Sequence, residues 1–106
     1  MRKITITLLA LGLVATTAAQ AAWNKNRLKP LNEDKKAKIR AALPAETLAK
    51  PKKPRRILVF YRCETFVHSS IVAGNFAIRE LGKKTGTFTA DLADEYSVFN
   101  KANLKK

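Results

Sequence analysis

The chain has 106 residues and a formal net charge of +13, and its length corresponds to one small domain. The charge is unevenly placed, because residues 24–56 hold twelve Lys or Arg against three acids, whereas residues 57–106 hold seven against five. The C-terminal half is therefore nearly neutral, which argues against nucleic-acid binding, since that function needs a basic face on a folded module. The single cysteine, Cys63, excludes an intrachain disulfide.

Residues 1–21 have the organisation of a secretory signal peptide. Two basic residues follow Met1, residues 4–14 are mostly apolar, and residues 19–21 read Ala-Gln-Ala, a small-x-small cleavage pattern. Polar residues after position 15 interrupt the apolar run before the roughly 20 residues that a spanning helix needs. We therefore expect cleavage rather than a stable transmembrane anchor, and export to the periplasm or the cell exterior.

Residues 22–54 are expected to form an irregular basic linker rich in Pro, Lys and Ala. Within it, Asn32 is placed to cap a short helix that has Glu33 and Asp34 in its first turn and ends at Pro44. The lysines of this linker allow two interpretations. They form a solvated spacer, or they attract the chain to an anionic cell-envelope surface.

A strand, a polar loop and a helix are expected from residue 55 onward. Residues 57–61 form an unbroken apolar run, typical of a strand buried on both faces of a parallel sheet. Ser69 and Ser70 are placed to cap a helix that runs to about residue 84. Gly74 interrupts this helix and is a candidate for close approach to the sheet, and Gly86 suits the left-handed position after its end.

Residues 88–92 are expected to form a second strand, which makes the whole a βαβ unit with a parallel strand pair. Asn100 then caps a further helix that has barely begun when the sequence ends. A parallel sheet needs several strands and helices on both faces before its faces are covered. We therefore expect residues 55–106 to be the N-terminal part of a longer α/β domain.

The stretch ILVFYRCETFVHSSIVAGNFAIRELG resembles the opening of a ThuA-like (trehalose-utilisation) domain. Such domains typically begin with an apolar strand, a loop ending in Phe-x-His and a Ser-Ile pair that opens the first helix, and Phe66, His68, Ser70 and Ile71 match this pattern. The later stretch DLADEYSVFNKANL is similar to the family's second strand and the Phe-x-x-x-Asn-Leu phrase after it. Thr65 stands where the family often has Gly.

The resemblance covers about half of the chain and implies a particular fold and role. The fold is a flavodoxin-like, class I glutamine amidotransferase-like parallel sheet, here truncated after the first βαβ unit. The role is carbohydrate binding or processing in sugar utilisation. Two alternatives stay open: a non-catalytic module that binds an anionic envelope surface through the linker, and an incomplete chain without independent activity, whose exposed strand edge favours aggregation.

Candidate site residues lie in the loop after the first strand, because ligands of open α/β sheets bind beyond the carboxyl ends of the strands. His68 is the catalytic candidate, since an imidazole can act as a base, a hydrogen-bond acceptor or a metal ligand. The alternative is a histidine that only bonds the backbone. Arg62, Glu64, Ser69 and Ser70 are the candidate ligand-binding residues.

No metal site is expected, and the sequence assigns no cofactor, sugar or reaction. Cys63, Glu64 and His68 are three potential ligands on one loop, but nothing else in the sequence completes a metal site. Cys63 also does not fit a glutamine amidotransferase nucleophile, because that cysteine lies on a later strand-to-helix elbow and no His–acid pair follows here. We expect Cys63 to be a half-buried, small apolar residue.

Overall fold

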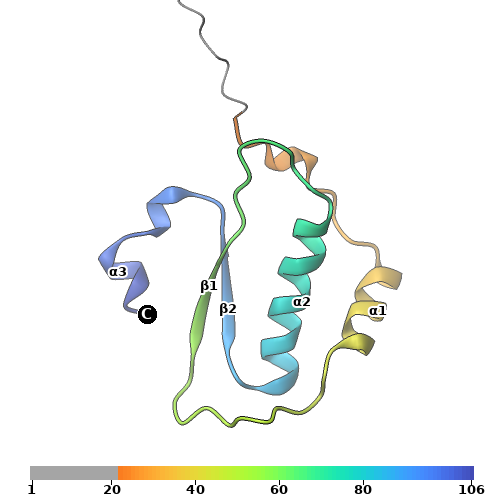
Figure 1. The fold of residues 1–106 in the computed structure, drawn as a ribbon, viewed down its shortest axis with the longest axis vertical. Helices are drawn as coiled ribbons and strands as arrows, with labels where there is room; N and C mark the ends of the chain where they lie inside the picture. Colours follow the sequence, from red (N-terminus) through yellow and green to blue (C-terminus); the bar gives the residue numbers. More distant parts are fainter. Residues whose placement is uncertain (1–21) are drawn as a thin grey trace, which may run out of the picture.

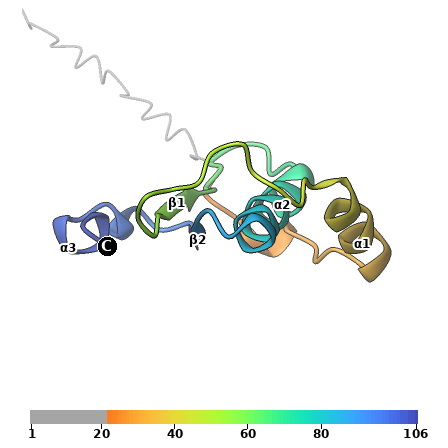
Figure 2. The same cartoon turned by 90° about the horizontal axis from the view of Figure 1, so that it is seen from below.

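The computed structural model describes residues 22–106, so the predicted signal peptide, residues 1–21, lies outside the described part of the chain. The elements in chain order are η1 (Lys25–Arg27), α1 (Glu33–Ala42), β1 (Arg56–Phe60), α2 (Ser70–Thr85), β2 (Thr89–Ala93), η2 (Tyr96–Val98) and α3 (Lys101–Leu104). Figure 1 and Figure 2 show α3, the strand pair, α2 and α1 side by side in a row. The described chain is therefore a small α/β unit, and its relation to flavodoxin-like sheets stays a prediction.

The two strands pair in parallel, with α2 as the connection between them. Their register runs from Arg56 opposite Thr89 to Phe60 opposite Ala93. The pairing continues past the last paired residues, because the Tyr61 backbone N–H donates to the Ala93 carbonyl oxygen at 3.0 Å. The expected strand–helix–strand order with a parallel pair is confirmed.

The expectation that the first strand is buried on both faces is wrong for this chain. Arg56 and Ile57 are exposed, and the other residues of β1 are only half-buried. Gly82 is the one buried residue between positions 22 and 106. The physical reason is that two strands and one crossover helix leave much of the sheet surface uncovered and both outer strand edges without a paired strand.

Gly82 allows the closest approach between α2 and the strand that follows it. A Cβ atom at this position would lie 2.3 Å from the Phe88 carbonyl oxygen and 2.6 Å from the Phe88 ring. At Gly74, by contrast, a Cβ atom would meet nothing within 4 Å, so the close approach that the sequence suggested for Gly74 occurs two turns later. The chain then turns at Gly86, whose φ of 66° is left-handed, as expected after a helix.

Helix α1 is the short helix expected within the basic linker. The Asn32 side chain accepts a hydrogen bond from the Lys35 backbone N–H at 2.9 Å, which confirms the predicted cap. The helix has 10 residues, and an isolated helix of that length is marginal in water. Its stability therefore depends on contacts with the rest of the fold.

Those contacts join α1 to α2. Arg40 Nε donates to the Glu80 carboxylate at 2.8 Å, and the Arg40 guanidinium lies 5.1 Å from the centroid of the Phe76 ring. Lys84 Nζ donates to the carbonyl oxygens of Arg40 and Leu43 at 2.7 and 2.6 Å, which satisfies free carbonyls at the C-terminus of α1. Part of the predicted linker is thus packed on the α/β unit.

Replacement of Gly82 by Ala should destabilise the fold by about 1–3 kcal/mol, because the added methyl group overlaps a backbone carbonyl that cannot rotate away. The matched control is Gly74→Ala in the same helix, which meets open space and should stabilise α2 by up to about 1 kcal/mol. Urea unfolding followed by circular dichroism measures both. Equal effects of the two substitutions would contradict the close packing at Gly82.

Replacement of Arg40 by Ala should release α1 from α2, because it removes the ion pair with Glu80 and the contact with the Phe76 ring. The backbone amides of α1 should then lose most of their protection from hydrogen exchange, since the helix is too short to persist alone. Lys38→Ala is the control, because Lys38 is exposed on the same helix. Unchanged protection in Arg40→Ala would show that α1 is held by other contacts.

Candidate functional site

The predicted site lies where β1 and β2 end and α2 begins. Parallel pairing brings the carboxyl ends of both strands to one edge of the sheet, and Figure 1 shows the first turn of α2 and η1 at the same end of the molecule. Arg62 and Glu64 follow β1 in the connecting loop, and His68, Ser69 and Ser70 lead into α2. This edge is where open α/β sheets bind ligands.

Arg62 is the centre of a polar cluster at this edge. Its guanidinium pairs with the Glu64 carboxylate and donates to the Asp94 carbonyl oxygen at 3.2 Å. It also lies 3.5 Å from the Glu95 carboxylate and 4.7 Å from the centroid of the Tyr96 ring. The Tyr96 hydroxyl in turn donates to Glu64 Oε1 at 2.9 Å. The structure thus joins two predicted residues to the segment that follows β2.

The cluster shifts the pKa values of its members. The hydrogen bond from Arg62 has the largest effect on the Glu64 carboxyl and lowers its pKa. The hydrogen bond from Tyr96 lowers it further. The bond to this carboxylate raises the pKa of the Tyr96 hydroxyl, because loss of the phenolic proton would place two negative charges in contact. Any stability that Glu64 contributes is present above its ordinary pKa of about 4.3 and is lost as the pH falls through the lowered pKa of the folded state.

Trp23 and Asp94 belong to the same edge, although neither was predicted as a site residue. Trp23 Nε1 donates to Asp94 Oδ2 at 2.8 Å, and the indole packs edge-on against Tyr61 at a centroid distance of 6.2 Å. Lys25 Nζ lies 3.4 Å from the Asp94 carboxylate. The bond from Trp23 lowers the pKa of Asp94, desolvation opposes this, and the charge of Lys25 adds to it.

A sequence signal existed for Asp94 but not for Trp23. Asp94 follows the second strand directly, and the carboxyl ends of parallel strands meet at one edge of a sheet. Trp23 lies 71 residues away along the chain, in a segment expected to be a spacer, and only the fold brings it to the site.

The expected serine cap of α2 is wrong, and His68 takes its place. The Ser69 side chain makes no capping hydrogen bond, because its backbone is already helical at φ −63° and ψ −22° rather than extended. His68 Nδ1 instead accepts from the Ser70 backbone N–H at 3.2 Å and lies 2.9 Å from Ser70 Oγ. A backbone N–H can only donate, so in this contact Nδ1 accepts and the ring proton lies on Nε2.

The predicted site residues therefore form two groups. Arg62 and Glu64 belong to the cluster around Tyr96, and His68 and Ser70 form the helix cap. Within residues 22–106, no hydrogen bond or salt bridge joins the two groups. A ligand that contacts both would have to bridge them along the loop.

Cys63 is a free, half-buried thiol that donates to the Phe66 carbonyl oxygen at 3.0 Å. In the described part of the chain, no three His, Cys, Asp or Glu side chains are grouped so that they could hold a metal ion. Between positions 22 and 106, no helix combines the length and apolar character needed to cross a membrane. Two cavities lie away from the loop, at the beginning of the strands and between the sheet and α3.

Comparison with known proteins found no matching family model, no matching curated protein and no matching solved structure. The ThuA-like resemblance therefore rests on the residues quoted above.

Replacement of Glu64 by Gln should lower the pKa of Tyr96, because it removes the negative charge that opposes ionisation of the phenol. The titration of Tyr96 can be followed by NMR of its ring carbons in the full chain. Glu46→Gln, in the exposed segment after α1, removes the same charge elsewhere and should leave the Tyr96 titration unchanged. A Tyr96 titration that is identical in Glu64→Gln and the original chain would contradict the bond between these two side chains.

Proposed function

We propose that the chain binds a carbohydrate at the carboxyl ends of β1 and β2. The observation that carries the proposal is the cluster of Arg62, Glu64 and Tyr96, which unites the loop after β1 with the segment after β2. Guanidinium donors, carboxylate acceptors and aromatic rings are groups that orient a polar ligand in an otherwise apolar site. The ThuA-like resemblance supports the same ligand class, and we infer that the protein acts in sugar utilisation after export.

The residues at the start of α2 supply further hydrogen-bonding groups. With Nδ1 of His68 engaged as an acceptor, its Nε2 is a donor, and the Ser69 hydroxyl makes no capping bond. His68 is exposed, as are both serines. We propose that His68 donates a hydrogen bond to a sugar hydroxyl from Nε2, so its role is hydrogen-bond donation rather than proton transfer.

The proposal is tested by NMR titration of the full chain with trehalose, and with glucose for comparison. Backbone signals of residues 62–70 and 94–96 should shift, and Glu64→Gln should weaken binding about tenfold, because hydrogen bonds to a charged group are lost. Glu46→Gln is the charge-matched control and should bind normally. Absence of binding to both sugars, or shifts confined to other residues, would refute the carbohydrate proposal.

Substitutions of His68 separate contact with the ligand from capping of the helix. His68→Ala removes both roles and should cost about 1 kcal/mol of stability as a lost cap, whereas Asn retains a side-chain cap acceptor but lacks Nε2. If His68 contacts the sugar, both variants bind more weakly. If His68→Asn binds like the original chain, His68 acts only by positioning α2. Thermal unfolding monitors the cap independently of sugar binding.

A further inference from the structure

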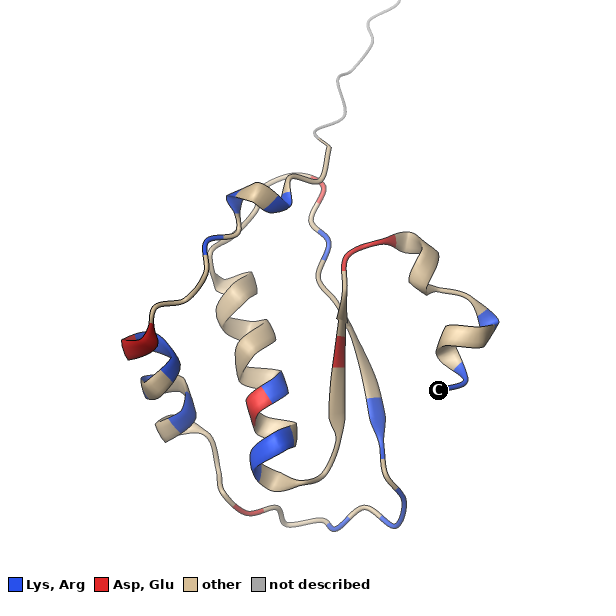
Figure 3. Cartoon of the chain, turned by 180° about the vertical axis from the view of Figure 1, so that it is seen from behind, with Lys and Arg blue, Asp and Glu red and all other residues tan. Residues whose placement is uncertain are grey.

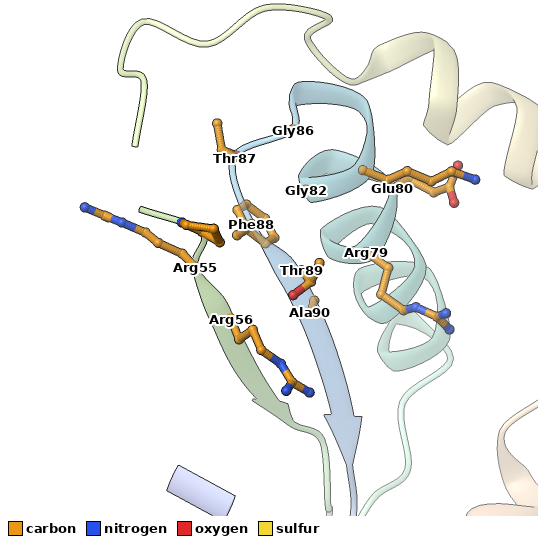
Figure 4. Close-up of a pocket in the computed structure, with 12 residues that line it drawn as sticks. Arg55, Arg56, Arg79, Glu80, Gly82, Gly86, Thr87, Phe88, Thr89 and Ala90 are labelled. Carbon is orange, nitrogen blue, oxygen red and sulfur yellow. The ribbon is translucent and has the colours of Figure 1, made fainter. Parts of the chain in front are cut away.

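A cleft at the opposite end of the strands has a strongly positive lining. It has a volume of about 680 Å³ and lies where β1 and β2 begin and α2 ends (Figure 4). This volume falls in the range of about 300–1,000 Å³ that is typical of small-molecule sites. The charged residues that line it are four cations and one acid: Arg55, Arg56, Arg79, Lys83 and Glu80.

Among the described residues, salt bridges engage only one of the four lining cations, although the Glu80 carboxylate also attracts the charges of Lys83 and Arg79. The Glu80 carboxylate accepts from Arg40 Nε at 2.8 Å, and Figure 4 shows its side chain directed away from the strands. Arg56 Nη2 pairs with the Asp91 carboxylate at 2.6 Å. Three lining cations form no salt bridge with any residue between positions 22 and 106: Arg55, Arg79 and Lys83.

The surroundings of the cleft add positive charge and an apolar surface. Figure 3 shows Lys and Arg gathered on the last turns of α2, on the segment before β1 and at the start of β1. Phe88 and Ala90 line the cleft between α2 and the strands. Gly82 also lines it but contributes no side chain to it. A ligand with anionic groups and an apolar part would meet complementary surfaces here.

The dipole of α2 acts against an anion at this end, because the C-terminus of a helix carries partial negative charge. Two lysines of the last turn offset that charge. Lys84 is engaged by the carbonyl oxygens of Arg40 and Leu43, which leaves Lys83 for the cleft. The arginines then favour phosphate over other anions, since a guanidinium offers paired N–H donors that match phosphate oxygens.

We propose that this cleft binds a ligand through its phosphate groups. Arg55, Arg79 and Lys83 are the determinants, and the ligand carries at least two negative charges, because Arg55 precedes β1 whereas Arg79 and Lys83 lie on α2. The site differs from attraction through a solvated linker, since two of the three residues belong to α2. It also lies at the opposite end of the strands from the proposed carbohydrate site, so either proposal can fail while the other stands.

The test is an NMR titration of the full chain with pyrophosphate and tripolyphosphate at constant ionic strength. Signals of residues 79–90 should shift, and the double substitution Arg79→Gln/Lys83→Gln should weaken binding about tenfold through loss of charge-assisted hydrogen bonds. The matched control is Lys35→Gln/Lys38→Gln, which removes the same charge from exposed positions of α1 and should change binding less than about twofold. Circular dichroism verifies that both double variants remain folded.

Flotation with lipid vesicles identifies the source of the phosphate. The vesicles consist of phosphatidylcholine alone or with about 30% phosphatidylglycerol, which gives them an anionic surface. Binding of polyphosphate without vesicle binding indicates a soluble ligand. Binding to the anionic vesicles that disappears in Arg79→Gln/Lys83→Gln indicates a lipid headgroup. Equal losses in the two double variants, shifts outside the cleft, or no binding to either probe would overturn the proposal.

Discussion

Parallel pairing between β1 and β2 is the interaction on which the other features of this molecule depend. It places the carboxyl ends of both strands at one edge and their amino ends at the other, so each edge collects residues that are far apart in the sequence. Arg62 meets Tyr96 only because their strands end together. Helix α2 can pack this close to the segment that leads into β2 because Gly82 has no side chain where the chain passes Phe88.

The two edges differ in charge. Acidic residues gather where the strands end, and each of these carboxylates already has a cationic or hydrogen-bonding partner: Glu64, Asp94 and Glu95. Cations that form no salt bridge with the described residues gather where the strands begin. Because exposed ion pairs contribute little to stability, this separation matters more for recognition than for folding. The two proposals follow this difference, with a neutral polar ligand at the first edge and an anion at the second.

The basic N-terminal segment is held on the fold at two places. Trp23 reaches the carboxyl end of β2 through Asp94, and Arg40 joins α1 to α2 through Glu80 and Phe76. These contacts partly compensate for the limited burial of the strand pair. Several aromatic and aliphatic side chains nevertheless remain largely exposed, among them Phe66, Tyr96, Phe99 and Leu104. In the described residues, stability therefore comes from local structure and partly covered contacts rather than from a fully buried core.

Local chemistry made much of this fold predictable from the sequence. The apolar run that became β1, the Asn32 and Asn100 caps and the left-handed Gly86 all depend on residues that are near one another in the chain. The edge that contains Arg62 and Glu64 was predictable for a similar reason, since the end of a strand is visible in the sequence.

Tertiary structure decided what depends on distant partners. The sequence determined that residues 22–54 are basic and contain a capped helix, but only the fold placed that helix on α2 and Trp23 beside Asp94. Helix α2 approaches Phe88 most closely at Gly82 rather than at Gly74, because packing depends on which face of the helix meets Phe88. Propensities and caps act over a few residues, whereas these outcomes depend on contacts between segments that the chain brings together only when it folds.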